Sequence, residues 1–408
     1  MSKSDIYGRW PFTWEEREKI LELDFAPEEY ERRIVAVRKA MEVAKLDALY
    51  IYAGEASKDK TNLRYLSGWD SFFGDSFMLL PLNGDPVLVT NSIFHGEPMH
   101  SNIQTTWVRD FRASLAFGAT LKLQSVVGYL LDAIREKGLR GKRLGYCNTR
   151  WTPSRIDAEL RASLSADEMI DSSAIIFKAR SRKSAAEIAA IRVAAHAASA
   201  GMALAIKAAI PGNTEHDVAA ALHFGMIKAG ADFSPLGMRL QSGVRSALKN
   251  VFPLKGKVIK AGEFVSIDSS GSYLGYWSDH ARTVVAGREP TPEQLELMDA
   301  CAQAWEAGFA AAKPGNSPSD VYRAMNEVIA ARGHSYWDWS LGHSFGLDLT
   351  EPPIFSPDNH TPLEPGTTFF LEPMIVPTLV GSVCYEDAVV ITESGAEKLT
   401  TTPLRVWE

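Results

Sequence analysis

The hydrophobic and polar positions in the first part of the chain follow two alternating patterns. Helical stretches such as EEYERRIVAVRKAMEVAKL, residues 28–46, are separated by short apolar runs. Short apolar runs between helical stretches are typical of an α/β layer. We therefore predict an α/β domain over residues 1–176, with strands at DALYIYAG (47–54), SFMLLPL (76–82), DPVLVT (85–90) and RLGYC (143–147).

A different pattern begins near residue 177. Ser184 is a candidate helix N-cap because Glu187 follows three residues later, and the long amphipathic stretch after it ends at a Pro-Gly pair. Helices and strands then follow in mixed order, which predicts an α+β domain over residues 177–408. We expect a second helix near 215–230, a strand pair at 262–286, helices at 291–312 and 318–332, and strands at 368–376 and 384–392.

The predicted strand pair contains SIDSSGSYLGYWSDHART, residues 266–283, in which Asp268 and Asp279 are eleven residues apart. We expect one strand to end at Asp268, SSGSY (269–273) to form the turn, and LGYWSDHARTVV (274–285) to return antiparallel. Facing strands bring side chains to within about 5 Å. Two ionised carboxylates at that distance repel unless a cation or a shared proton lies between them. Two exposed turn aspartates remain the alternative at this point.

Three further residues extend this set. His343 lies in a Gly-flanked loop, Glu372 ends an apolar strand, and Glu386 lies inside another apolar strand. A buried glutamate without a partner is costly. With the two aspartates these residues form an oxygen-rich ligand set with one imidazole, which suits manganese, iron, cobalt or zinc. Because two divalent ions balance four carboxylates, we predict two divalent metal ions.

Composition narrows the class of partner. The 408 residues are enough for two domains, and 46% hydrophobic with 23% charged residues is typical of a globular protein. The net charge of -7 is spread along the chain, so we expect a small-molecule partner and no nucleic acid or membrane. No stretch approaches the roughly 18 uninterrupted apolar residues of a membrane span, and a cytoplasmic location is expected. Three distant cysteines indicate neither a disulfide framework nor a cysteine zinc site.

The order and local context of these residues resemble the M24, or pita-bread, family. The motifs are IDSSGSYLGYWSDHART, GHSFGLDLTEPP, LEPM and YEDAVVITESGAEKLT, and the resemblance covers residues 184–400. TNLRYLSGW in the first domain is similar to the small domain of the creatinase, prolidase and aminopeptidase P branch. The resemblance implies an α/β N-terminal domain, an α+β pita-bread catalytic domain and a homodimer.

The resemblance also implies roles for individual residues. Asp268 would hold one metal, His343 and Glu372 would hold the second, and Asp279 and Glu386 would bridge both. A water bound by the metals would be the nucleophile, with Glu372 as proton acceptor and His343 beside it at the catalytic centre.

Three positions depart from the peptidase pattern. LQSGVRSALKNVFPLKGK (240–257) offers Asn250 or Lys249, and no histidine, where peptidases place a substrate-binding histidine. Thr350 takes the place of a second histidine, and Cys384 takes the place of an arginine. These departures favour a specificity that diverges from that of Xaa-Pro peptidases.

Other candidate substrate contacts point to a cation. Asp75, two residues past Phe73, stands where creatinases place a carboxylate-binding arginine, and Trp337 and Trp339 precede His343. Aromatic faces beside an acidic group attract quaternary ammonium or sulfonium groups, by about 0.5 to 2 kcal/mol per contact. The alternatives are an ordinary turn aspartate and aromatic residues of the core.

Three hypotheses follow. The first is a dinuclear metallohydrolase that cleaves a C–N or amide bond in a dipeptide or similar small substrate. The second is a metal-dependent lyase or hydrolase of a cationic osmolyte, similar to dimethylsulfoniopropionate lyase. The third, a non-catalytic binding protein on the same fold, is disfavoured because buried carboxylates without metal cost several kcal/mol.

Overall fold

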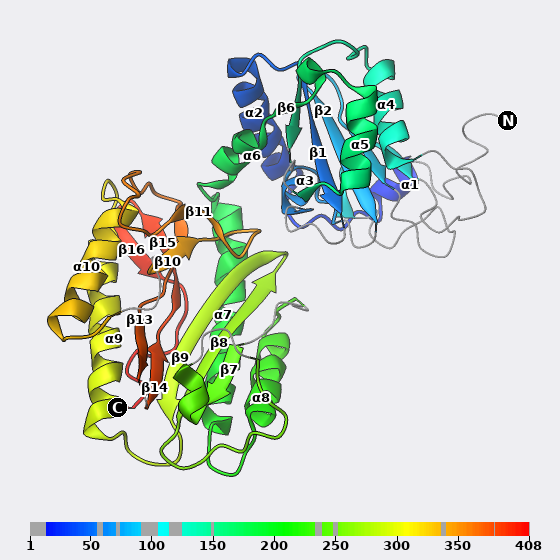
Figure 1. Cartoon of the computed structure of the whole chain (residues 1–408). Coiled ribbons are helices and arrows are strands. Elements are labelled where there is room, and N and C mark those ends of the chain that lie inside the picture. Colours follow the sequence, from blue (N-terminus) through cyan, green and yellow to red (C-terminus); the bar gives the residue numbers. More distant parts are fainter. Residues whose placement is uncertain are drawn as a thin grey trace. The chain divides into compact units, whose positions relative to one another are not determined.

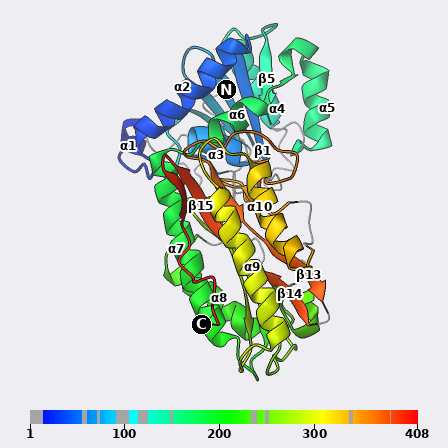
Figure 2. The same cartoon turned by 90° about the vertical axis from the view of Figure 1, so that its left-hand side faces the viewer.

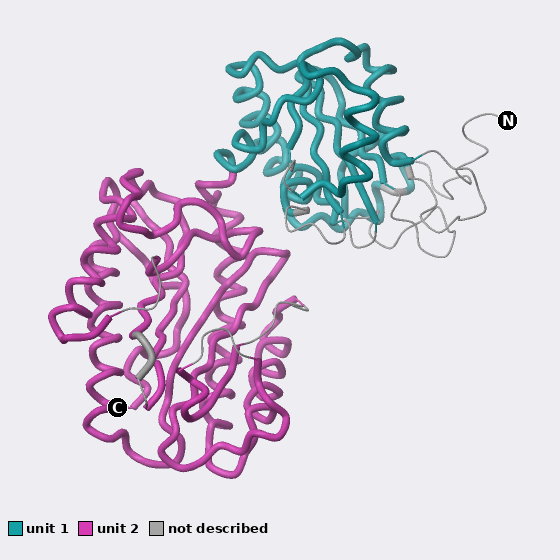
Figure 3. Tube along the Cα trace, in the orientation of Figure 1, with its two compact units in different colours: residues 1–179 teal, residues 180–408 magenta. Residues whose placement is uncertain are grey.

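The structure, a computed structural model, describes residues 14–54, 60–70, 74–90, 105–113, 125–147, 151–232, 239–247, 252–335, 340–378 and 380–407. The chain divides into two compact units, residues 1–179 and 180–408 (Figure 3). The domain boundary expected from sequence, between residues 176 and 177, falls inside helix α6 (Ser173–Arg180).

Unit 1 contains a six-stranded sheet in the order β4-β3-β2-β1-β5-β6 (Figure 1). The central strand β1 pairs antiparallel with β2 and parallel with β5, and all its residues are buried. Helices α4 and α5 pack on one face, where Leu130 and Ile156 join Tyr50 and Phe77 in a core. The predicted α/β layer is confirmed. Its elements are α1 (Trp14–Glu18), α2 (Pro27–Val43), β1 (Ala48–Gly54), α3 (Lys60–Ser67), β2 (Asp75–Pro81), β3 (Val87–Thr90), β4 (Asp110–Ala113), α4 (Val126–Glu136), β5 (Leu144–Cys147), α5 (Ser154–Ser163), the 3-10 turn η4 (Ala166–Glu168) and β6 (Ile170–Asp171).

Four long helices frame unit 2. The first begins where the sequence predicts, because Ser184 accepts a hydrogen bond from the backbone N–H of Glu187 and the Glu187 carboxylate accepts one from the backbone N–H of Ser184. The other three also start at side-chain N-caps. The helices are α7 (Ala185–Ala208), α8 (Glu215–Lys228), α9 (Pro292–Ala311) and α10 (Pro318–Ala331).

Three sheets lie between these helices. One has the order β7-β8-β9, one the order β11-β10-β12-β15-β16, and one pairs β13 with β14. The strands are β7 (Arg239–Ser242), β8 (Phe264–Tyr273), β9 (Tyr276–Val285), β10 (Gly342–Ser344), β11 (Glu351–Ile354), β12 (Thr368–Leu371), β13 (Met374–Thr378), β14 (Gly381–Cys384), β15 (Asp387–Thr392) and β16 (Gly395–Lys398), with a 3-10 turn η5 (Gly243–Ala247) after β7.

The hydrophobic core explains how the helices are placed. Met202 of α7 and Leu222 of α8 pack with Ile267 on one face of β8. On the other side of unit 2, Met325 of α10 packs with Phe369 and the neighbouring strand β15, and α9 and α10 run side by side (Figure 2). The face of β8 opposite Ile267 carries Asp268. Two helix pairs thus cover the sheets from outside and leave the inner strand faces for a site.

The turn of the β8–β9 hairpin differs from the prediction. SSGSY is part of β8, and the chain reverses at Leu274 and Gly275, whose φ angles are 51° and 76°. Two-residue hairpin turns with positive φ at both central positions match the twist of the strands, which favours a glycine at one of them. The prediction of a turn at 269–273 was therefore wrong: β8 is longer than expected, and β9 begins at Tyr276 rather than at Leu274.

The strands expected at 368–376 and 384–392 are each interrupted. Pro373 has no N–H for a ladder bond, and the backbone N–H of Glu372 donates to the carbonyl of Leu341 at 3.1 Å. The first run is therefore split into β12 and β13, and the second into β14 and β15. Glu372 and Glu386 lie at these two breaks.

One described helix, α7, is long and apolar enough to cross a membrane by length and composition. The sequence-based expectation concerned uninterrupted apolar residues, and α7 is interrupted by the charged residues Glu187, Arg192 and Lys207. Just over half of its most apolar stretch is buried inside the unit. A core helix of a soluble domain passes the same test.

Candidate metal centre

The three-stranded sheet β7-β8-β9 carries a polar face. The register pairs Arg239 with Asp268 and Asp268 with Ala281, while Asp279 pairs with Ser270. Since alternate residues of a strand share a face, Asp268 and Asp279 are diagonal neighbours on one face, and Arg239 lies beside Asp268. The hairpin thus brings the two aspartates together, but through a longer pairing than the sequence suggested.

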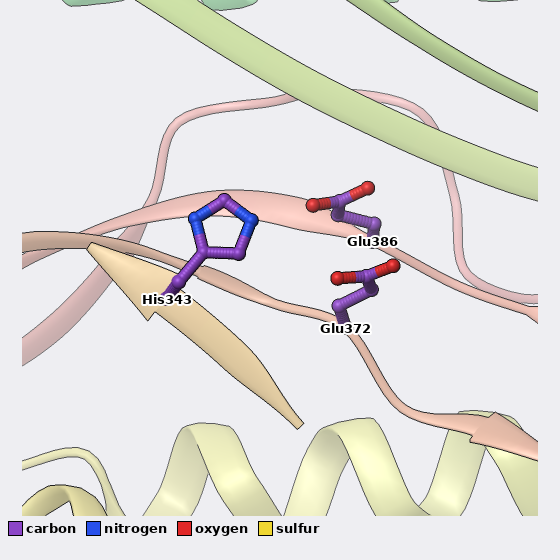
Figure 4. Close-up of side chains that lie close together, drawn as sticks. All are labelled: His343, Glu372 and Glu386. Atoms are coloured by element: carbon purple, nitrogen blue, oxygen red, sulfur yellow. The ribbon is translucent and has the colours of Figure 1, made fainter. Parts of the chain in front are cut away.

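The second half of the centre comes from the five-stranded sheet. His343 lies on β10, Glu372 directly follows β12 and Glu386 directly precedes β15, and Figure 4 shows the three side chains gathered. Each offers one ligand atom, and these atoms lie within 4.8 Å of one another. Asp268, Asp279 and Glu386 form a second group under the same limit, so Glu386 belongs to both.

Backbone bonds hold the two halves in register. Ala281 and Glu386 exchange backbone hydrogen bonds of 3.1 and 3.2 Å. The carbonyl of Glu386 also accepts from His280 Nδ1 at 2.8 Å. Next to it, Arg282 donates to both carboxylate oxygens of Asp387, at 2.9 and 3.0 Å, and all of these side chains are fully buried. This network of hydrogen bonds holds in place the backbone segments that carry Asp279 and Glu386.

The carboxylates of the centre are strongly perturbed. Burial, reinforced by Asp279, raises the pKa of Asp268 to about 7, although Arg239 opposes the shift. Burial, followed by the charges of Asp279 and Glu372, raises the pKa of Glu386 well above its ordinary value. The other groups of the protein therefore do not neutralise the negative charges of these carboxylates.

The residues present fit a pair of divalent ions. Among the described residues, Oε1 of Glu386 is buried and has no hydrogen-bond partner, which is unusual for a buried carboxylate oxygen. On the other side, His343 Nδ1 lies 3.2 Å from the carbonyl of Ser344, an acceptor that places the ring proton on Nδ1, so that Nε2 is the ring nitrogen suited to hold a metal. Oxygen donors with one imidazole are typical of manganese, iron, cobalt and zinc sites.

Two residues beside the centre were missed from sequence. Arg239 Nη1 donates to Asp268 Oδ2 at 3.0 Å, and Gln241, on the same face, has a buried Oε1 with no hydrogen-bond partner in the described part of the chain. The signal was the alternation in the short strand RLQS, which places Arg239 and Gln241 on one face. Strand β7 was not predicted because its four residues, Arg239–Ser242, are too few for a clear alternating pattern.

The remaining sequence candidates are scattered. Asp75 lies in unit 1 at the start of β2, where it accepts from Tyr52 Oη at 2.6 Å and pairs with Arg155 at 3.4 Å. Thr350 is an exposed loop residue directly before β11. The other four candidates, Phe73, Asn250, Trp337 and Trp339, lie outside the residues that the structure describes.

The comparisons with known families agree with this architecture. The sequence profile of metallopeptidase family M24 matches residues 189–393, and that of the creatinase/prolidase N-terminal domain matches residues 33–182. The chain belongs to metallopeptidase family M24. Its two profile matches place it in the creatinase and prolidase branch, as predicted, and members of the family depend on metal ions, generally in a dinuclear site.

Individual relatives extend this assignment. The uncharacterized peptidase YqhT of Bacillus subtilis is 30% identical over 84% of this chain and 92% of its own length. The Xaa-Pro dipeptidase of Pyrococcus furiosus is 35% identical over 54% of this chain and 63% of its own length. The ectoine hydrolase of Halomonas elongata is 25% identical over 94% of this chain and 98% of its own length. Among solved structures, the prolidase from Pyrococcus horikoshii OT3 has a TM-score of 0.77 at 26% identity and covers 91% of this chain and 99% of its own.

Proposed function

We propose that this protein is a dinuclear metallohydrolase that cleaves an amide bond in an Xaa-Pro dipeptide or a closely related small substrate. The observation that carries the proposal is the convergence of Asp268, Asp279, His343, Glu372 and Glu386 in two ligand groups that share Glu386. The Xaa-Pro dipeptidase and prolidase relatives support the reaction class.

In this proposal Asp268 would hold one ion, His343 and Glu372 would hold the other, and Asp279 and Glu386 would contribute to both. Bound metal ions would supply positive charge that polarises the scissile carbonyl and activates water. Glu372 is half-buried at the break between β12 and β13. It accepts the proton of the attacking water and returns it to the leaving nitrogen, which places a proton where the amine is released.

A second candidate is the hydrolysis of a C–N bond in a small non-peptide compound. The ectoine hydrolase relative matches almost the whole chain, and Thr350 and Cys384 stand where the peptidase pattern has a histidine and an arginine. Under this candidate the metal centre is unchanged, and only the contacts to the rest of the substrate differ.

A substrate panel separates the candidates. Purified protein is assayed with manganese, iron, cobalt or zinc against Xaa-Pro dipeptides, ectoine, and quaternary ammonium and sulfonium acids, with Glu372→Gln as the control that keeps the fold. Cleavage of Xaa-Pro dipeptides by the wild type and not by the variant supports the leading proposal. Release of a sulfide from a sulfonium acid would replace it with the lyase, and turnover of ectoine alone would replace it with the second candidate.

One broader expectation belongs to the same proposal. We expect a homodimer, by resemblance to the creatinase branch.

A further inference from the structure

Arg239 carries a positive charge beside a site that is proposed to bind two divalent ions. It lies on β7 opposite Asp268, and its side chain is 37% exposed, whereas Asp268 is buried. Besides its contact with Asp268, the guanidinium interacts electrostatically with Asp279, Glu372 and Glu386, and it is open to solvent on one side.

The hydrogen bonds of Arg239 leave most of its donors unused. Its contact with Asp268 Oδ2, 3.0 Å long, is its one hydrogen bond among the residues that the structure describes. A guanidinium offers five N–H donors in a planar fork that matches a carboxylate. By contrast, the neighbouring arginines Arg282 and Arg245 donate to Asp387 and Glu215. Arg239 thus has donors for a second carboxylate that no hydrogen bond to the described residues uses.

The balance of charges in the centre also favours an anionic group on the substrate. The four carboxylates carry about four negative charges, which two divalent ions neutralise without help. Arg239 then adds one positive charge in excess, beside an ion that competes with it for Asp268. An excess cation with free donors next to the reacting bond is complementary to an anionic group on the substrate.

We propose that Arg239 binds a free carboxylate of the substrate close to the scissile bond. This inference rests on the proposed function and narrows it to small amides that carry a carboxylate, such as dipeptides and N-acyl amino acids. Cys384 stands where the peptidase pattern has an arginine, so the cation comes from β7 rather than from the strand before Glu386. Arg239 is then a specificity-determining residue and not a metal ligand.

The test measures ligand binding and not turnover. Protein loaded with manganese, with metal content checked by elemental analysis, is titrated calorimetrically with L-proline and with L-prolinamide, which lacks only the carboxylate charge. We expect the wild type to bind L-proline about tenfold or more tightly than L-prolinamide, since a hydrogen bond to a charged group contributes about 1.5 to 3 kcal/mol. Arg239→Gln should remove this difference, and Arg239→Lys should restore part of it.

The controls separate this inference from the proposed function. Arg323→Gln changes an exposed arginine on α10 that pairs with Asp320, and it should keep the wild-type preference for L-proline. If the wild type takes up no metal, the proposed function fails first. If the wild type binds metal and Arg239→Gln keeps the preference for L-proline, the inference is overturned. The same holds if the only effect of Arg239→Gln is tighter metal binding, because Arg239 then only pairs with Asp268.

Discussion

Glu386 is the residue on which the metal centre depends most, because its carboxylate belongs to both ligand groups and one oxygen lacks any protein partner in the described structure. Replacing it with glutamine keeps the shape but removes the charge that two ions share. We predict that Glu386→Gln lowers metal content from about two ions per chain to one or none, and activity by about 100-fold or more. Elemental analysis and turnover measure both, with exposed Glu393→Gln as the control. Full metal content in Glu386→Gln would contradict the bridging role.

Asp268 gives the metal-free protein a pH dependence. Its pKa is raised to about 7 in the folded state, mainly by burial, from about 3.9 in the unfolded chain. The stability that its protonated form provides is present below pH 4 and is lost as pH rises through about 7. We predict that metal-free Asp268→Asn is more stable than metal-free wild type at pH 8, and that the difference shrinks towards pH 5.

Denaturant unfolding at both pH values measures this difference, and added manganese provides the control. Metal should stabilise the wild type far more than Asp268→Asn, because the variant has lost a ligand. A metal-free wild type that is the more stable protein at pH 8 would show that Arg239 compensates the buried charge fully.

At the scale of single elements, β10 shows that the position of the metal ligand His343 depends on how its strand packs. Gly342 has φ of 145°, and a Cβ there would lie 2.0 Å from the carbonyl oxygen of Phe370 on β12. His343 is the next residue, so relief of that clash moves its imidazole. We predict that Gly342→Ala destabilises the protein by about 2 kcal/mol or more and weakens metal binding.

Thermal unfolding and metal titration measure the two effects of Gly342→Ala. Gly395→Ala is the matched control, since it has the same φ of 145° but no atom within 4 Å of the added Cβ. Equal loss of metal affinity in both variants would mean that backbone strain, and not the contact with β12, controls His343.

Some elements could be predicted from the sequence, and others could not. Capped helices such as α7 are predictable because Ser184 and Glu187 satisfy local hydrogen bonds. The hairpin turn was misplaced because Gly271 and Gly275 are equally good turn residues, and only the pairing of the two strands decides between them. The break after Glu372 needed the bond to Leu341, a contact between distant segments.

At the scale of the whole molecule, the fold follows from the order of elements and from the family motifs, and both are visible in the sequence. The ligand types could be predicted because a carboxylate in an apolar strand is costly without a partner. The place of Arg239 could not, because it depends on the register of β7 against β8, which no local pattern specifies.

The most direct test of the metal centre is a metal titration of the purified, metal-free protein by calorimetry, with the stoichiometry checked by elemental analysis. We predict two divalent ions per chain for the wild type, held by the five residues of the two groups that share Glu386. A wild-type protein that folds and takes up no divalent metal would contradict it.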